Sequence, residues 1–231
     1  MSLALAHDPR VVLPENPIFP KYSAGERMAD AVVHIISVAI SLAAVITLMI
    51  VAWPLAEPLS IISLWVYGTG MVAVFAFSAG YHLVRRPILK EALRRLDHAA
   101  IFVMIAGSCT PFALVNIGGA YGIALLSVVW GIGLLGIALK LFLPRRFERV
   151  SIGLYLVQGW AVLAVVQPLA SGVSPLVLTL LAIGGGLYTV GVAFHLCHRL
   201  SYHNAIWHTL VLVAAGCHYV AILDAVALPL P

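Results

Sequence analysis

The feature that most constrains this chain is a series of seven apolar stretches of about 20 residues, separated by short polar connections. A stretch of this length crosses the hydrocarbon core of a bilayer as a helix, because a backbone in lipid must satisfy its own hydrogen bonds. The sequence therefore predicts an all-α membrane protein, a bundle of seven transmembrane helices. The predicted spans are Ala31–Ala52, Ser60–His82, Asp97–Val115, Ala120–Leu139, Val150–Leu169, Leu176–Phe194 and Asn204–Ala225.

The basic residues predict which way this bundle faces. All 13 lysines and arginines fall in the N-terminal segment or in the connections 83–96, 140–149 and 195–203. The other three connections and the C-terminus contain none. Since basic loops stay on the cytoplasmic side of a membrane, we expect a cytoplasmic N-terminus and an outer C-terminus.

The same pattern predicts the domain organisation and the partners. We expect a cytoplasmic N-terminal segment over residues 1–30, the bundle over 31–226 and a short outer tail over 227–231, with no separate soluble domain. The net charge of +4 comes from loops beside the membrane. It therefore indicates contact with lipid headgroups and not with nucleic acid, and no soluble protein partner is predicted.

Polar side chains gather at the predicted cytoplasmic edge of four spans, whereas the outer halves of the spans are nearly bare of them, with His218 as the main exception. Ionisable groups at membrane depth are costly, so they usually face the bundle interior, find partners and mark a functional site. The residues that meet at this edge are His34, Ser78, His82, Asp97, His98, His203, Asn204 and His208.

Imidazoles from different helices, with a carboxylate beside them, can hold a zinc ion. Zinc lowers the pKa of a water molecule to about 7, and Asp97 is placed to deprotonate that water or to orient a histidine. Each residue also has a plainer interpretation. A histidine at the interface can bond a backbone carbonyl, Asp97 can stabilise a helix N-terminus, and Ser78 can serve helix packing. Their convergence at one depth favours a site.

Three motifs at these positions carry a resemblance to a known family. They are Phe77–His82, Arg95–Phe102 followed by Thr110-Pro111-Phe112, and His203–His208 with Cys217-His218. Together they resemble the bacterial hemolysin III proteins, which are similar to the progestin and adipoQ receptors (PAQR) and, more distantly, to alkaline ceramidases. The resemblance covers the chain from its first span to its last, and it implies a multi-pass protein of the bacterial inner membrane.

The resemblance also implies a zinc ion and particular site residues. It makes His82 the ligand from the second span and His208 the second histidine of a His-x3-His pair, with Ser78 and Asp97 completing the catalytic pattern. The first histidine of that pair falls on Asn204, and His203 precedes it. We favour His203 as the third ligand; binding through Asn204 or a water, and a weaker site or none, stay open.

Three classes of function remain open. The first is a zinc-dependent hydrolase of lipid amide or ester bonds, as the ceramidase resemblance implies. The second is a membrane protein without catalysis, either a sensor or regulator of membrane state or a cytolytic protein. The third, a transporter or channel, is disfavoured because the predicted membrane centre has no clear acidic or basic residue.

Overall fold

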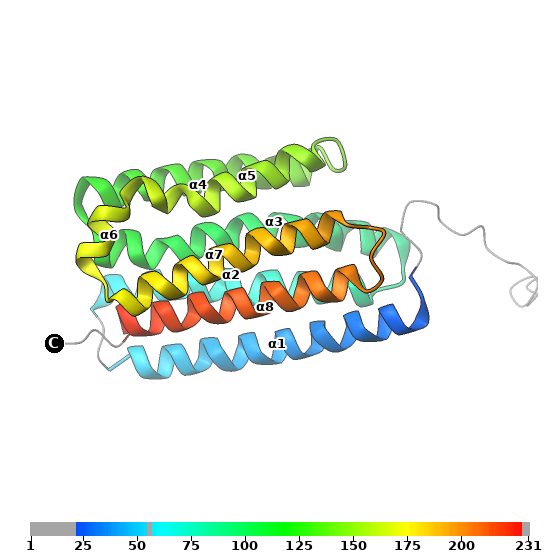
Figure 1. The fold of residues 1–231 in the computed structure, drawn as a ribbon, viewed down its shortest axis with the longest axis horizontal. Helices are drawn as coiled ribbons and strands as arrows, with labels where there is room; N and C mark the ends of the chain where they lie inside the picture. Colours follow the sequence, from blue (N-terminus) through cyan, green and yellow to red (C-terminus); the bar gives the residue numbers. More distant parts are fainter. Residues whose placement is uncertain (1–21, 55–56, 228–231) are drawn as a thin grey trace, which may run out of the picture.

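The chain folds into a single bundle of long helices, and the computed structural model describes residues 22–54 and 57–227 of it (Figure 1). No β-strand occurs in these two ranges. Seven helices there are long and apolar enough to cross a membrane, which confirms the predicted seven-span, all-α fold. The helices are α1 (Ala24–Ala52), α2 (Pro58–Leu83), α3 (Pro87–Pro111), α4 (Gly119–Phe142), α5 (Glu148–Trp160), α6 (Val166–Gly172), α7 (Pro175–Leu196) and α8 (His203–Ile222).

Three of the seven spans are composite. The third continues from α3 into a π-helix, η1 (Phe112–Ile117), and the last continues from α8 into another, η3 (Leu223–Ala227). The fifth consists of α5, a 3-10 helix η2 (Ala161–Val165), and α6. The change after α3 follows Pro111, whose ring removes a backbone N–H from the helical ladder.

Two helices begin seven or more residues earlier than the sequence predicts, whereas the other five spans begin within two residues of the predicted start. Helix α1 starts at Ala24 because Ser23 and Glu26 form a capping box, in which each side chain bonds the backbone N–H of the other. Helix α3 starts at Pro87, well before the predicted start at Asp97. The prediction was wrong there because basic residues were assigned to a loop. In the structure Lys90, Arg94 and Arg95 lie on the first turns of a helix that extends beyond its apolar part, whereas Arg85 and Arg86 precede it.

Helices α2 and α3 form the centre of the bundle. They approach closely at two glycines: a Cβ on Gly70 would lie 3.3 Å from the Cα of Met104, and one on Gly107 would lie 3.3 Å from the carbonyl oxygen of Val66. Large side chains such as Tyr67 fill the interior around them. The outer faces are apolar and exposed, as expected of surfaces that contact lipid.

Every lysine and arginine of the described ranges lies at one end of the bundle, at the right in Figure 1. This end, which we call the basic end, comprises the start of α1 and the connections α2–α3, α4–α5 and α7–α8. Arg10 and Lys21 lie outside the described residues. The basic end is the one that the sequence predicts to face the cytoplasm, and η3 ends at the opposite end of the bundle.

Candidate metal centre

Four side chains from three helices meet inside the basic end of the bundle. Asp30 and His34 come from the beginning of α1, His82 from the last turn of α2, and His208 from the beginning of α8. One possible ligand atom from each of them lies within 4.8 Å of the others. We call these four residues the tetrad. No other group of three or more histidine, cysteine, aspartate or glutamate residues in the described ranges meets this spacing.

The carboxylate of Asp30 links the three imidazoles of the tetrad. Its Oδ2 lies 2.6 Å from Nδ1 of His82, and its Oδ1 lies 2.9 Å from Nδ1 of His208 and 3.5 Å from Nε2 of His34. The ring centroids of the three histidines are 4.2 to 4.6 Å apart. The tetrad is mostly buried, and the side chain of Asp30 is 13% exposed.

The tetrad fits a divalent metal ion such as zinc. Its donors are three imidazoles and one carboxylate, the nitrogen and oxygen ligands that zinc accepts. Nε2 of His34 is buried, and its contact with Asp30 Oδ1 at 3.5 Å falls short of a hydrogen bond, so this atom has none within the described part of the chain. A buried nitrogen without a partner is costly, and a cation in the tetrad would supply one.

The structure brings together two of the three histidines that the sequence predicts as ligands. His82 and His208 belong to the tetrad, and so does His34, which the sequence placed at the same edge without assigning it as a ligand. His203 is not a member. It is 5% exposed, and its ring packs against those of Tyr22 and His198. The geometry therefore favours His34 over His203 as the third imidazole.

Asn204 does not join the tetrad either. Its side chain lies beside the phenol of Tyr22, just before α1. Burial raises the pKa of this Tyr22 phenol, so the phenol stays protonated.

Sequence reasoning missed Asp30, although its spacing gave a signal. Asp30 and His34 are four residues apart, as are Ser78 and His82. This spacing puts two side chains on one face of a helix. The predicted start of the first span at Ala31 left Asp30 in a loop, where its spacing to His34 carried no meaning.

Asp97 and Ser78 lie together beside the tetrad. Each is 7% exposed, and the side chain of Ser78 lies beside the Asp97 carboxyl group. His82 and Arg94 are in electrostatic reach of the same carboxyl group. Because α3 begins at Pro87, Asp97 lies in the body of the helix, and its interpretation as a helix-terminal residue is wrong. A buried carboxyl group close to a candidate metal site needs another explanation.

A large cavity of about 1830 Å³ opens from this site into the bundle. Near the basic end its wall includes the tetrad, Ser78 and Asp97. Towards the other end its wall is mostly apolar and includes Phe112, Leu169 and Leu178, with His218 as a polar exception. The cavity thus combines a polar end, where chemistry is possible, with an apolar part long enough for a hydrocarbon chain.

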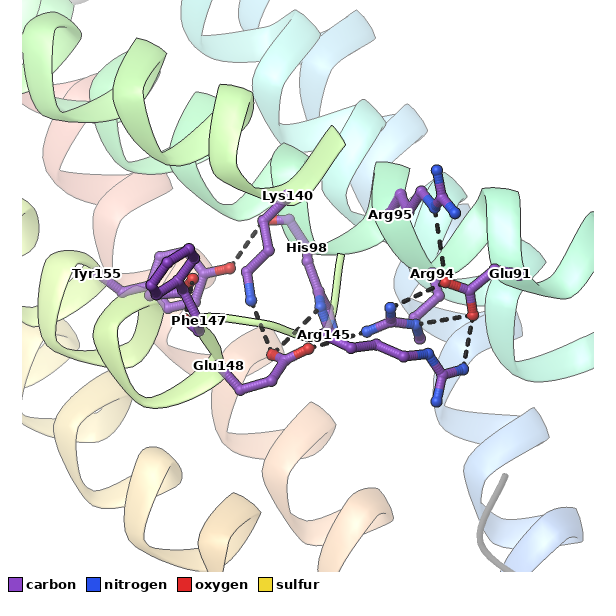
Figure 2. A network of polar contacts seen from close by, with 10 residues as sticks. Glu91, Arg94, Arg95, His98, Lys140, Arg145, Phe147, Glu148 and Tyr155 are labelled. Carbon is purple, nitrogen blue, oxygen red and sulfur yellow. Dashed lines mark hydrogen bonds and ion pairs between the residues drawn. The ribbon is translucent and has the colours of Figure 1, made fainter. Parts of the chain in front are cut away.

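Figure 2 shows a network of charged side chains at the basic end of the bundle. Three of its members, Arg94, Lys140 and Glu148, also line the cavity. Glu148, at the start of α5, accepts from Lys140 Nζ at 2.7 Å and from Arg94 Nη1 at 3.0 Å. Glu91 accepts from Arg94 at 3.0 Å and from Arg145 at 2.7 Å. The cations Arg94 and Lys140 are nearly fully buried, so the two carboxylates hold α3, α4 and α5 together at the basic end.

The fold and the site define a class: an integral membrane protein of seven helical spans with a candidate metal centre inside one end of the bundle. The chain belongs to the family described as "Haemolysin-III related", whose sequence model matches residues 24–219. The family assignment agrees with the resemblance seen in the sequence motifs.

Individual relatives agree with the family assignment. The chain is 36% identical to "Hemolysin-3 homolog" of Bacillus subtilis (strain 168), over 86% of this chain and 93% of that protein. It is 34% identical to "Hemolysin-3" of Bacillus cereus, over 86% and 90%. It is 28% identical to the human "Monocyte to macrophage differentiation factor", over 70% and 69%. No solved structure matches the chain.

Proposed function

We propose that this protein is a zinc-dependent hydrolase that cleaves acyl amide or ester bonds of membrane lipids at the basic end of the bundle. The observation that carries the proposal is the place of the tetrad, at the polar end of a cavity that is otherwise mostly apolar, and beside the buried pair Asp97 and Ser78. We further propose that the protein lies in a bacterial inner membrane with its basic end in the cytoplasm.

The imidazoles of His34, His82 and His208 would hold the ion, with the Asp30 carboxylate beside them. When bound, zinc supplies Lewis acidity, which polarises a carbonyl and lowers the pKa of a water to about 7. Asp30 contacts Nδ1 of both His82 and His208, so it also fixes the orientation of these rings.

Asp97 is the proposed general base. Its carboxylate would take a proton from the attacking water and pass it to the leaving amine or alcohol of the lipid. Ser78 would donate a hydrogen bond to this carboxylate and hold it beside His82. Neither residue is needed to hold the ion, so substitution of Asp97 separates catalysis from metal binding.

The apolar part of the cavity would take the acyl chain of the lipid. Helices α5 and α7 both line it, and they pack only sparsely against each other. One hydrogen bond crosses this gap, from Trp160 Nε1 to Thr189 Oγ1 at 3.1 Å. A lipid from the leaflet at the basic end would therefore enter between these two helices, near Trp160.

The test uses the full chain purified in detergent without chelator, with a ceramide-like amide and a lysolipid ester as substrates. We expect close to one zinc per chain and hydrolysis of at least one substrate. Asp97→Asn should keep the zinc and lose turnover by about 100-fold or more. His82→Ala should lose both. Asp224→Asn, at the opposite end of the bundle, is the matched control and should behave as wild type.

Two results would contradict the hydrolase. One is a zinc-loaded protein that leaves both lipids intact. The other is an Asp97→Asn variant with wild-type turnover, which would leave Asp97 as a structural residue.

The number of ligands in the tetrad favours a second function. Four protein ligands close a zinc site, as in structural centres, whereas catalytic sites keep a position for water. A closed site would fit a sensor or regulator of membrane state, or the lytic role in the name of the Bacillus cereus relative. X-ray absorption at the zinc edge with an added small thiol decides between the two functions. A new Zn–S distance of about 2.3 Å, from a thiolate in an open position, supports the hydrolase, and an unchanged set of nitrogen and oxygen ligands supports the second function.

A further inference from the structure

We propose that His198 and His203 form a second, weaker cation site, through which a divalent metal passes from the basic end of the bundle to the tetrad. The inference rests on the metal centre of the proposed function. It gives a role to His203, the predicted ligand that lies outside the tetrad, and to the connection between α7 and α8.

The two rings are placed as a pair. Their centroids are 5.3 Å apart and their planes meet at 84°. Two imidazoles that share a tetrahedral ion at Zn–N distances of about 2.0–2.1 Å have ring centroids roughly 5 Å apart. The observed separation therefore matches that of two imidazoles that share an ion.

The pair joins the surface to the interior. His198 is exposed in the α7–α8 connection, whereas His203, the first residue of α8, is 5% exposed. Nδ1 of His203 is buried and makes no hydrogen bond within the described residues. A buried nitrogen of this kind loses its contact with water and gains nothing in return, so it favours a ligand that can bind to it.

Further into the bundle from His203, the next group of possible metal ligands is the tetrad. His203 lies five residues before His208 on α8, about 7.5 Å along the helix axis. Asp30 is in electrostatic reach of His203, and so is the carboxylate of Glu26, which bonds the backbone N–H of Tyr202. Both negative charges favour a cation at His203. Both histidines of the pair also line the cavity that contains the tetrad.

An ion can pass through a site only if the site releases it, and the two sites differ in how tightly they should hold an ion. The tetrad offers four donors in a mostly buried place, whereas the pair offers two, one of them exposed to solvent. His195 is in electrostatic reach of both rings and also lines the cavity, but the three do not form a compact group of ligands. The pair should therefore bind more weakly and exchange faster than the tetrad.

The experiment titrates metal-free, full-length protein in detergent with Co²⁺ and follows visible absorption at equilibrium and after rapid mixing. Wild type should bind one tight and one weaker equivalent. His82→Ala should lose the tight equivalent and keep the weaker one. His198→Ala should lose the weaker one, keep the tight one and fill it several-fold more slowly. Because His198 is exposed, its substitution should not disturb folding.

Two further variants complete the test. His203→Gln, which keeps a polar group in the buried position, should reproduce His198→Ala. His218→Gln, on the same helix but far from the pair, is the matched control and should load as wild type. If both His198→Ala and His203→Gln keep the weaker equivalent and load at the wild-type rate, the proposed site at His198 and His203 is wrong. If wild type lacks the tight equivalent, the metal centre and the passage both fail; a normal tight site without a weaker one overturns only the pair.

Discussion

Oδ1 of Asp30 lies 2.9 Å from Nδ1 of His208, which joins the first span to the last across 178 residues of sequence. The same carboxylate contacts His82 on the second span. Asp30 is therefore the residue through which α1, α2 and α8 meet at the candidate metal centre. If this centre holds an ion, the carboxylate must either bind it or orient the imidazoles that do.

Substitution of Asp30 should weaken metal binding. Asp30→Asn removes the negative charge but keeps the size and one oxygen acceptor, so we expect zinc affinity to fall by about 10- to 100-fold, as for a residue that orients ligands. In Asp30→Ala the zinc affinity should fall at least as far. The measurement is competition for zinc against a chelating dye, with the protein in detergent.

Asp224→Asn is the control for Asp30→Asn. Asp224 is an acid in η3, at the other end of the bundle, where it accepts from Ser174. Its substitution should leave the affinity unchanged. Wild-type zinc affinity in both Asp30 variants would mean that the carboxylate serves only helix packing.

Asn204→His should restore metal binding to a tetrad that lacks His34. Asn204 lies one turn before His208 on the same face of α8, and both line the cavity. We expect His34→Ala to lose most of its zinc, and His34→Ala with Asn204→His to regain it, because a new imidazole replaces the missing one. Zinc content by elemental analysis is the readout.

The control for this rescue places the same side chain elsewhere. His34→Ala with Gly216→His puts an imidazole farther along α8, where space is open, and should stay free of zinc. A zinc-free His34→Ala/Asn204→His protein would show that the face of α8 at Asn204 does not reach the tetrad.

The seven spans could be predicted because the length of an apolar stretch is a direct property of the sequence. Which of His203 and His34 joins His82 and His208 could not be predicted. Both lie at the same depth, and the side that each presents to the bundle depends on the rotation of its helix, which packing decides. Asp30 was missed for a different reason: its helix begins at a local cap, and helix ends are the least certain part of a sequence prediction.

Loss of the Glu148 carboxylate should destabilise the basic end of the bundle. In Glu148→Gln, the buried cations Lys140 and Arg94 lose the anion that they share. Breaking a fully buried ion pair costs about 3–5 kcal/mol, but Glu148 is itself partly exposed, so we expect about 1–3 kcal/mol. The expected result is a lower melting temperature in detergent. Glu57→Gln, an exposed acid between α1 and α2, should melt as wild type, and equal melting of the two variants would contradict a stabilising role.

Two glycines of α4 should respond in opposite ways to alanine. A Cβ on Gly136 would lie 2.2 Å from Cζ of Phe102, a fully buried ring that packs against Tyr155, so neither side can give way easily. We expect Gly136→Ala to destabilise the protein by about 1–3 kcal/mol, as overpacking does. Nothing lies within 4 Å of a Cβ on Gly131, so Gly131→Ala should be neutral or slightly stabilising, because alanine favours a helix. Thermal unfolding of both variants in detergent measures the difference. Equal melting temperatures would mean that α4 moves away from Phe102 at little cost, and that the contact between α3 and α4 is looser than their packing indicates.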